Sequence, residues 1–367
     1  MSNSEASEFD FEKHKRAAIE TYRKIKPLYE AYCNTLKTVL TKCLEMKQIK
    51  YHSIESRAKD IDHFGDKAFQ ASEEDSNVPK YKNPLSEITD IAGVRIITFF
   101  PITINEVDKV ISQEFEVLEK NDKNDLLEKE EKLGYQSVHY LVKFKDSRIA
   151  HPEYATYNNL VAEIQVRTIL QHAWAEIEHD IEYKSVVTIP KAIKRRFMAL
   201  AGLLEIADRE FQSIQNENEE LKIKSRKSVT TGKLNNVEIT GDSLKAYLDK
   251  GYGADGRMNQ FSYEFMAKTL IKIGFENLKQ IDDCIKDYDD NKISKIIWGT
   301  RAGQISRLEF VLLAALGDEY IIRHPWCISG EQNCVFWKDV FTERLKSLKK
   351  AGIKTGTYKL NYISDKQ

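Results

Sequence analysis

The chain has 367 residues, of which 41% are hydrophobic and 31% charged, and its formal net charge is −1. This balance is typical of a globular protein with a sizeable core, and it excludes a disordered chain and a protein that binds nucleic acid through a large overall positive charge. No apolar stretch has the length of a membrane span, the first residues lack the apolar segment of a signal peptide, and the five cysteines are scattered. We therefore expect a cytoplasmic protein that makes no membrane contact.

Apolar spacing predicts secondary structure through the first 224 residues. Apolar side chains three and four apart from Ile19 to Cys43 predict a long helix over 9–49, whose apolar face packs on its own domain or forms an oligomer contact. The pattern then predicts a strand–helix pair over 51–71, a strand over 91–100, a helix over 103–113, strands over 115–119, 137–144 and 160–167, and helices over 169–183 and after Pro190. Because strands and helices do not alternate regularly, we expect an α+β fold with a mixed β-sheet flanked by helices.

The rest of the chain is expected to form a second domain. Residues 225–236 are polar and poor in large apolar side chains, which is typical of a linker between domains. Residues 237–367 contain several apolar helical segments, so we expect a smaller, mostly helical domain there.

Cationic side chains cluster where the first predicted strand meets a helix. Arg57 and Lys59 are two apart and share one face of the strand, while His63 and Lys67 are four apart and share one face of the helix. Such a cluster suits a triphosphate, whose charge must be neutralised for transfer. The alternative is that these residues lie on ordinary solvated faces.

Carboxylates mark two later strands. Asp90 directly precedes the strand at 91–100, and Glu163 lies on the strand at 160–167 with Gln165 and Arg167 on the same face. A polar face on a buried strand is costly unless it is paired or lines a site. If Glu163 lies opposite Asp90, the pair would form a two-carboxylate Mg²⁺ site; the alternative for Asp90 is a helix or turn cap.

A turn and strand between these segments carry candidate acceptor-binding residues. Gly134 permits a tight turn, and Tyr135 has a ring that could stack on a nucleobase. Ser137 and His139 follow on one face of a strand, so both could face the same cleft.

Taken in this order, these segments resemble the RelA/SpoT (p)ppGpp synthetase domain over about residues 10–215. The matching positions are Arg57, Lys59, His63 and Lys67; Asp90, Gly93 and Arg95; Gly134, Tyr135, Ser137 and His139; Glu163, Ile164, Gln165, Arg167 and Thr168; and Trp174, Ala175, Glu178, His179, Tyr183 and Lys184. Collinear agreement of several motifs is far more specific than any one of them.

The resemblance implies a nucleotidyltransferase-like fold and a set of residue roles. ATP would be bound by Arg57, Lys59, His63, Lys67 and Arg95, and the acceptor by Tyr135, Ser137, His139, Gln165 and Arg167. Asp90 and Glu163 would be the catalytic residues and would hold Mg²⁺. The implied reaction moves the β,γ-pyrophosphate of ATP to a ribose 3′-hydroxyl and releases AMP.

We consider two hypotheses for the acceptor. One is GDP or GTP, giving (p)ppGpp. The other is the 3′-CCA end of tRNA, modified by a toxic relative whose fused C-terminal domain acts as antitoxin and phage sensor. Alarmone-making relatives carry Lys and Asn just ahead of the Gly-Tyr turn, where this chain has Glu131 and Leu133. That departure and the additional C-terminal residues favour tRNA. Basic runs at 191–196 and 222–227 could contact its phosphates; the alternative is that they are ordinary solvated helix faces.

The last residues carry two tyrosines with a candidate regulatory role. Tyr358 and Tyr362 lie in a glycine-flanked segment that could fill the nucleobase cleft, and a protein ligand such as a phage protein could release it. The alternative is a terminal strand that completes its own small domain.

Overall fold

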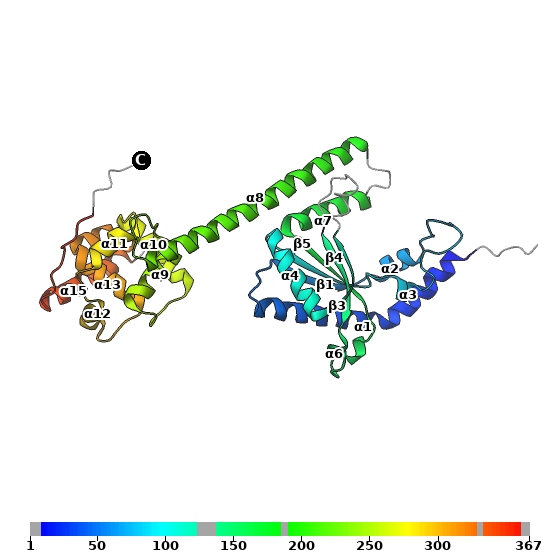
Figure 1. Cartoon of the computed structure of the whole chain (residues 1–367), viewed down its shortest axis with the longest axis horizontal. Helices are drawn as coiled ribbons and strands as arrows, with labels where there is room; N and C mark the ends of the chain where they lie inside the picture. The colour runs from blue at the N-terminus through cyan, green and yellow to red at the C-terminus, as the bar shows by residue number, and fades with distance from the viewer. Residues whose placement is uncertain (1–8, 123–136, 185–189, 329–332, 361–367) are drawn as a thin grey trace, which may run out of the picture. The chain divides into compact units, whose positions relative to one another are not determined.

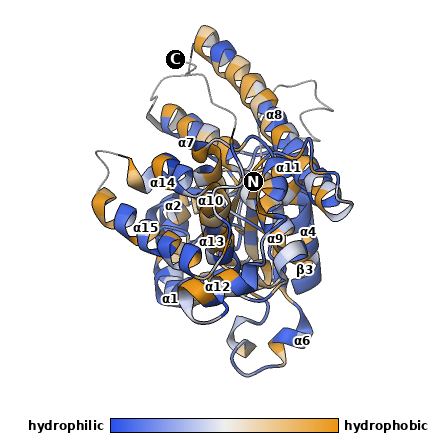
Figure 2. Cartoon of the chain, turned by 90° about the vertical axis from the view of Figure 1, so that its left-hand side faces the viewer, coloured by the Kyte–Doolittle hydropathy of each residue, from blue (hydrophilic) through white to orange (hydrophobic). Residues whose placement is uncertain are grey.

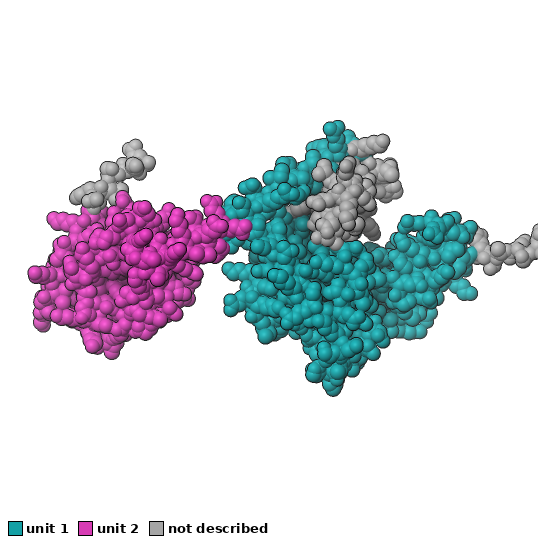
Figure 3. All heavy atoms as spheres, viewed as in Figure 1, with its two compact units in different colours: residues 1–215 teal, residues 216–367 magenta. Residues whose placement is uncertain are grey.

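The computed structural model describes residues 9–122, 137–184, 190–328 and 333–360. The chain divides into two compact units, residues 1–215 and 216–367 (Figure 3). No helix among the described residues has the length and apolar character needed to cross a membrane.

The first unit contains the strands and the helices that pack on them (Figure 1). Its elements are α1 (Phe11–Met46), β1 (Ser53–Ala58), α2 (Ile61–Ala68), α3 (Pro84–Glu87), β2 (Ala92–Thr98), α4 (Pro101–Glu114), β3 (Phe115–Asp122), β4 (Val138–Phe144), α6 (Asp146–Ile149), β5 (Ala162–Thr168), α7 (Ile169–Lys184) and the start of α8 (Lys191–Thr230). The described strands form one sheet in the order β1-β2-β5-β4-β3. Since β2 and β5 are parallel and the other neighbours antiparallel, the predicted mixed sheet is confirmed.

One face of this sheet is apolar and carries the core of the unit. Alternate strand residues such as Ile54, Val94 and Ile164 are buried against α1 and α4. Helix α1 begins where the side chain of Asp10 accepts a hydrogen bond from the backbone of Lys13. Its buried Tyr22 donates from its hydroxyl to the carbonyl of Lys59, 2.6 Å away, which ties the helix to the end of β1.

The opposite face of the sheet is polar, and α7 lies against β2 and β5 on that side (Figure 1). Trp174 of α7 packs with Ala201 and Phe197 of α8. At the end of β5, the hydroxyl of Thr168 donates to Asp208 of α8 over 2.6 Å, and both residues are buried. Helix α8 therefore fixes the end of β5, the strand that carries Glu163.

Replacing Asp208 by alanine is expected to lower the free energy of unfolding by about 1–3 kcal/mol, because the buried hydroxyl of Thr168 loses its acceptor. Urea denaturation followed by circular dichroism measures this change. The control is Glu210→Ala, an exposed acidic residue on the same helix. Equal losses in both variants would show that the Thr168–Asp208 contact contributes nothing.

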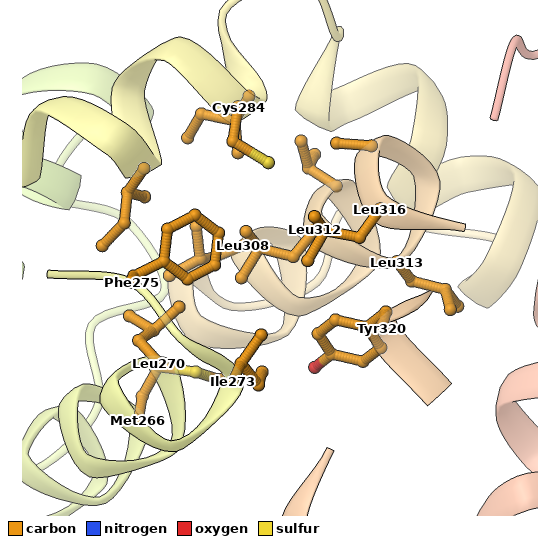
Figure 4. Packing of buried hydrophobic residues seen from close by; sticks show 14 of the residues in the cluster. Met266, Leu270, Ile273, Phe275, Cys284, Leu308, Leu312, Leu313, Leu316 and Tyr320 are labelled. Atoms are coloured by element: carbon orange, nitrogen blue, oxygen red, sulfur yellow. The ribbon is translucent and has the colours of Figure 1, made fainter. Parts of the chain in front are cut away.

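The second unit is helical, as the sequence predicts for the C-terminal region. Its elements are the end of α8, α9 (Gly241–Tyr252), α10 (Gln260–Ile273), α11 (Leu278–Ile285), α12 (Asp290–Trp298), α13 (Gln304–Leu316), α14 (Asp318–Arg323) and α15 (Cys334–Lys350). Helix α13 is buried on nearly all sides, as its almost continuous apolar sequence requires. Figure 4 shows Leu308, Leu312 and Leu316 of α13 packed among side chains of the surrounding segments.

The linker predicted at 225–236 needs correction. Residues 225–230 continue helix α8, and Val229 and Leu234 are buried in the core of the second unit. The amine of Lys250 donates to the carbonyls of Val229 and Thr230, and Gly232 then ends the helix with a φ of 74°. The boundary between the two compact units lies between residues 215 and 216, inside α8. A polar composition marked this segment as a linker, but a few apolar residues are enough to anchor it.

Candidate active site

Strand register brings the predicted site residues onto the polar face of the sheet. Arg57 pairs with Gly93, and Gly93 pairs in turn with Glu163. One step along the strands, Gln165 lies between Arg95 and His139. Since alternate residues share a face, side chains from four adjacent strands converge on one patch.

A cavity of about 570 Å³ opens over this patch. It is lined by Glu55, Ser56, Arg57, Lys59, Asp60, His63, Asp66, Lys67, Asp90, Gly93, Val94, Arg95, Glu163, Gln165 and His179. All the residues predicted to bind ATP, both predicted catalytic carboxylates and Gln165 are therefore in one place. Gly93 has no side chain, so the space above the sheet between Arg57 and Glu163 is not filled at this position.

Asp90 lies between the predicted phosphate-binding lysines. Its Oδ2 atom accepts hydrogen bonds from the amines of Lys59 and Lys67, each over 2.7 Å. Its other oxygen, Oδ1, is buried and has no hydrogen-bond partner. Asp90 therefore pairs with both lysines through one oxygen, and the hydrogen bonds of its side chain to described residues include no helix or turn cap.

The two lysines also set the protonation of Asp90. Burial by itself would raise the pKa of this carboxyl, but the hydrogen bonds and positive charges of Lys59 and Lys67 outweigh burial, and the pKa is held below 3.8. A depressed pKa means that this group contributes stability above its ordinary pKa, and that the contribution is lost as the pH falls through the lower, folded-state value.

In the double variant Lys59→Met/Lys67→Met, the pKa of Asp90 is expected to rise above 3.8, because burial then acts without the two compensating charges. Carboxyl carbon shifts followed by NMR during a pH titration measure the change. The control is Lys120→Met, which removes a cation that pairs with Asp108 outside the cavity. An unchanged Asp90 titration in the double variant would contradict the assigned cause.

Glu163 belongs to a chain of hydrogen bonds along the polar face. Its Oε1 is 2.6 Å from Nδ1 of His139, and its Oε2 accepts from the amide of Gln165 over 2.9 Å. The oxygen of the same Gln165 amide accepts from the guanidinium of Arg167, and Nε2 of His139 is 2.7 Å from the hydroxyl of Ser137. Ser137, His139 and Arg167 do not line the cavity; they orient the residues that do.

The environment keeps Glu163 ionised. Burial alone would raise the pKa of its carboxyl, but the hydrogen bond and charge of His139, with the Gln165 amide, hold the pKa below its usual value. The charge of Asp90 acts in the opposite direction, so the two carboxylates are near enough to influence each other. Burial and the charge of Arg95 lower the pKa of Arg167 to about 10, which still leaves the guanidinium charged at neutral pH.

The two carboxylates fit a magnesium ion. Mg²⁺ prefers hard oxygen ligands and is commonly bound by one or two carboxylates together with substrate phosphates. Asp90 offers a buried oxygen with no other partner, and Glu163 lies across the cavity floor. Among the described residues, no group of three or more His, Cys, Asp or Glu side chains forms a separate metal site.

Several cavity residues were not assigned from the sequence. Glu55 could have been found, because strand alternation places it on the face of Arg57. Asp60 lines the cavity but also caps α2 by accepting from the backbone of Asp62 over 2.8 Å. His179 belongs to the matched α7 segment and had no predicted role. Arg95 pairs with Glu176 of α7 over 2.8 Å, which links the helix to the site.

Some predicted site residues lie elsewhere or outside the described residues. Tyr135, the predicted stacking ring, and Tyr362 are both outside the described residues. Tyr358 is partly buried against the core of the second unit, and its backbone N–H donates to the carbonyl of Ala315 over 3.0 Å. The described part of this segment contains no strand, and its contacts are those of a segment that completes its own domain.

Known proteins resemble the part of the chain that forms this site. The family described as "Region found in RelA / SpoT proteins" matches residues 56–187. The chain is 30% identical to GTP pyrophosphokinase YjbM of Bacillus subtilis over 142 residues, which are 37% of this chain and 64% of the relative. It is 32% identical to GTP pyrophosphokinase YwaC of the same organism over 136 residues, 37% of this chain and 62% of the relative. The chain thus spans a little under two thirds of each relative's length.

One solved structure similar to this chain is that of a small alarmone synthetase. The small alarmone synthetase 1 of Bacillus subtilis is 23% identical, and the match covers 55% of this chain and 99% of that protein with a TM-score of 0.44. The matched family region runs from Ser56 on β1 to residue 187, beyond α7, and so contains most of the residues that line the cavity. Residues 56–187 of this chain therefore match the region found in RelA/SpoT proteins.

Proposed function

We propose that the chain transfers the β,γ-pyrophosphate of ATP to the 3′-hydroxyl of a ribose, with Mg²⁺ as cofactor. The observation that carries this proposal is the cavity in which Arg57, Lys59 and Lys67 face the carboxylates of Asp90 and Glu163. Transfer of phosphoryl groups depends mainly on positioning and charge neutralisation, and this cavity supplies cations for a triphosphate and hard oxygens for its metal. Both curated relatives are named GTP pyrophosphokinases, which supports the same chemistry.

We assign some residues to the binding of ATP and its metal and one to the binding of the acceptor. Lys59, Lys67 and Arg57 bind the phosphate oxygens, and His63 and Arg95 line the same cavity. When bound, Mg²⁺ would neutralise charge on the transferred group while held by Asp90 and Glu163. Tyr135 would stack on the base of the acceptor.

Glu163 also orients the attacking hydroxyl. The 3′-oxygen forms a bond to the β-phosphorus of ATP, the bond from the β-phosphorus to the oxygen shared with the α-phosphorus breaks, and AMP leaves. Glu163 accepts the hydroxyl proton, and His139 on its other side holds the carboxylate in place.

The test is to incubate the purified chain with ATP labelled at the γ-phosphate and with GDP, GTP or bulk tRNA in separate reactions. Label in a guanosine nucleotide supports an alarmone synthetase, and label in tRNA, lost after removal of the 3′-terminal adenosine, supports modification of the CCA end. If label is released only as phosphate or pyrophosphate with every acceptor, the proposed transfer is wrong.

Modification of tRNA is the second candidate. It rests on the sequence departure at Glu131 and Leu133, which lie outside the described residues, and on a C-terminal unit with a hydrophobic core of its own. With tRNA as the acceptor, the proposed role of residues 237–367 is to restrain transfer until a protein ligand binds them.

A fragment that ends at Gln215 is expected to transfer pyrophosphate at least about tenfold faster than the full chain and to stop bacterial growth, because an intramolecular restraint acts at high effective concentration. Transfer assays and induced expression measure both effects, and thermal denaturation checks that the fragment is folded. Its control is the fragment with Glu163→Gln. A folded fragment no more active than the full chain would contradict the restraint.

A further inference from the structure

Helix α8 ends beside a second cavity, which lies within the second unit. Its volume is about 840 Å³, and every residue that lines it falls between Asn218 and Lys279. Small-molecule sites in proteins commonly have volumes of roughly 300–1,000 Å³. Figure 2 shows polar residues interspersed with apolar ones along α8. The cavity is therefore large enough for a metabolite, and the chemistry of its lining decides which kind.

The segment that follows α8 forms one wall of this cavity and is anchored on both sides. Leu234 and Val237 are buried in the core of the second unit, and the carbonyl of Val237 accepts a hydrogen bond from the N–H of Leu278 over 3.1 Å. Asn235 and Asn236 lie between these anchors, are exposed and line the cavity. Because the backbone is held in place, this wall is preformed, which lowers the cost of ordering it when a ligand binds.

Helix α8 contributes a second wall, which is mostly polar. Asn218, Ser225 and Ser228 line the cavity and are seven and three residues apart, so they lie on one face of the helix. Ser225 and Ser228 are half-buried, and neither hydroxyl forms a hydrogen bond with a described residue. The side chain of Leu221 lines the cavity on the same face. This wall thus offers hydroxyl donors and one apolar contact to a ligand.

Two of the amines in the cavity have no carboxylate partner. The lining contains the amines of Lys222, Lys224, Lys233 and Lys279. Lys222 and Lys279 each donate to a carboxylate of their own helix, over 2.9 and 2.8 Å. Lys224 and Lys233 form no ion pair with a described residue. The charges of these two amines are therefore available to a ligand.

The carboxylates of the lining leave this positive charge in excess. Asp242 pairs with Arg226 over 3.1 Å, so its charge is already compensated. Glu238 is exposed and forms no ion pair with a described residue. Two unpaired amines are thus accompanied by one unpaired carboxylate, and the cavity attracts anions.

We propose that this cavity binds a small molecule that carries two or more phosphate groups. Lys224 and Lys233 contact the phosphate oxygens, since two amines match a ligand with more than one negative charge. The free hydroxyls of α8 and the amides of the anchored segment donate the remaining hydrogen bonds. The lining comes from α8, the segment after it, α9 and α11, and such a hollow suits a compact ligand better than the extended backbone of RNA. The proposal does not depend on the reaction at the active site.

Equilibrium dialysis of the full chain against labelled pyrophosphate tests the site. The chain carries Lys59→Met/Lys67→Met, which removes two amines from the active-site cavity and makes the second cavity the main site measured. The added change Lys224→Met/Lys233→Met is expected to raise the dissociation constant at least about tenfold, because both charge-assisted contacts are lost. If the chain without the added change binds no pyrophosphate up to about 1 mM, the proposal is overturned.

Two further variants separate the cavity from general surface charge. Lys268→Met/Lys272→Met removes two exposed amines of α10 outside the cavity and should leave the dissociation constant unchanged. Ser225→Leu keeps every charge but removes a hydroxyl and fills part of the cavity, so it should raise the constant at least about threefold. Thermal denaturation checks that each variant is folded. An equal effect from the α10 pair, or no effect of folded Ser225→Leu, contradicts the site.

Competition distinguishes a small ligand from RNA. At about 150 mM salt, which limits non-specific contacts with phosphates, ADP is expected to displace the labelled pyrophosphate at lower concentration than an RNA hairpin of about 20 nucleotides. A hairpin that displaces the label at lower concentration than ADP would assign these lysines to RNA and overturn the proposal of a small ligand.

Discussion

Replacing Glu163 by glutamine is expected to lower the rate of pyrophosphate transfer about 10³-fold, a loss typical of removing a preorganised catalytic group. Glutamine keeps the size of the side chain, so His139 and Gln165 retain a neighbour, but the variant lacks the negative charge that we propose to hold Mg²⁺ and to take up the hydroxyl proton. The rate is measured with labelled ATP and whichever acceptor is found.

The matched control is Glu116→Gln, which changes a partly exposed carboxylate on β3 that pairs with Lys143 outside the cavity. It should transfer pyrophosphate at the wild-type rate. Thermal denaturation should give both variants a melting temperature close to that of the wild type. Near-normal turnover by the Glu163 variant would remove this carboxylate from the reaction.

Replacing Asp90 by asparagine is expected to change ATP binding and pyrophosphate transfer in opposite directions. Transfer should fall about 10²–10³-fold because the carboxylate proposed to bind the metal is lost. Binding of ATP without metal should become tighter, because Lys59 and Lys67 lose the carboxylate that neutralises them and are left to the phosphates. Calorimetry with and without Mg²⁺ measures the binding, and labelled ATP measures the transfer.

Asp60→Asn is the control for this variant, because Asp60 lines the same cavity but caps α2, a role that asparagine also performs. It should keep the magnesium dependence of the wild type. If Asp90→Asn weakens ATP binding equally with and without Mg²⁺, then Asp90 acts through the structure of the cavity rather than through the metal.

The fold of the first unit could be predicted because its elements have simple periodicities. The alternation of Glu163, Gln165 and Arg167 with Ile164 and Val166 identified β5 and its polar face, and the structure places these residues on that face. Strand order could not be predicted, since pairing of β2 with β5 joins segments about seventy residues apart without a local signal. The contact of Lys59 with Asp90 depends on the pairing of β1 with β2, and so it appears only in three dimensions.

The boundary between the units shows a second limit of sequence analysis. The polar composition of residues 225–236 predicted a linker between the units. In the structure the boundary between the units lies at residues 215 and 216, inside the 40-residue helix α8. Helical propensity is compatible with the Lys, Ser and Arg residues there, and two buried apolar residues decide the outcome. The role of the last residues was equally open; in the structure Tyr358 packs against the core of the second unit, and its backbone N–H donates to the carbonyl of Ala315.

The amide of Gln165 has one possible orientation in this site. On one side it meets Glu163, which can only accept hydrogen bonds when ionised, and on the other Arg167, which can only donate them. The terminal amide of glutamine donates hydrogen bonds through its nitrogen and accepts them through its oxygen. A glutamate at position 165 would set two negative charges side by side, and a lysine would repel the guanidinium. Gln165 thus separates the carboxylate of Glu163 from the guanidinium of Arg167 and forms a hydrogen bond with each.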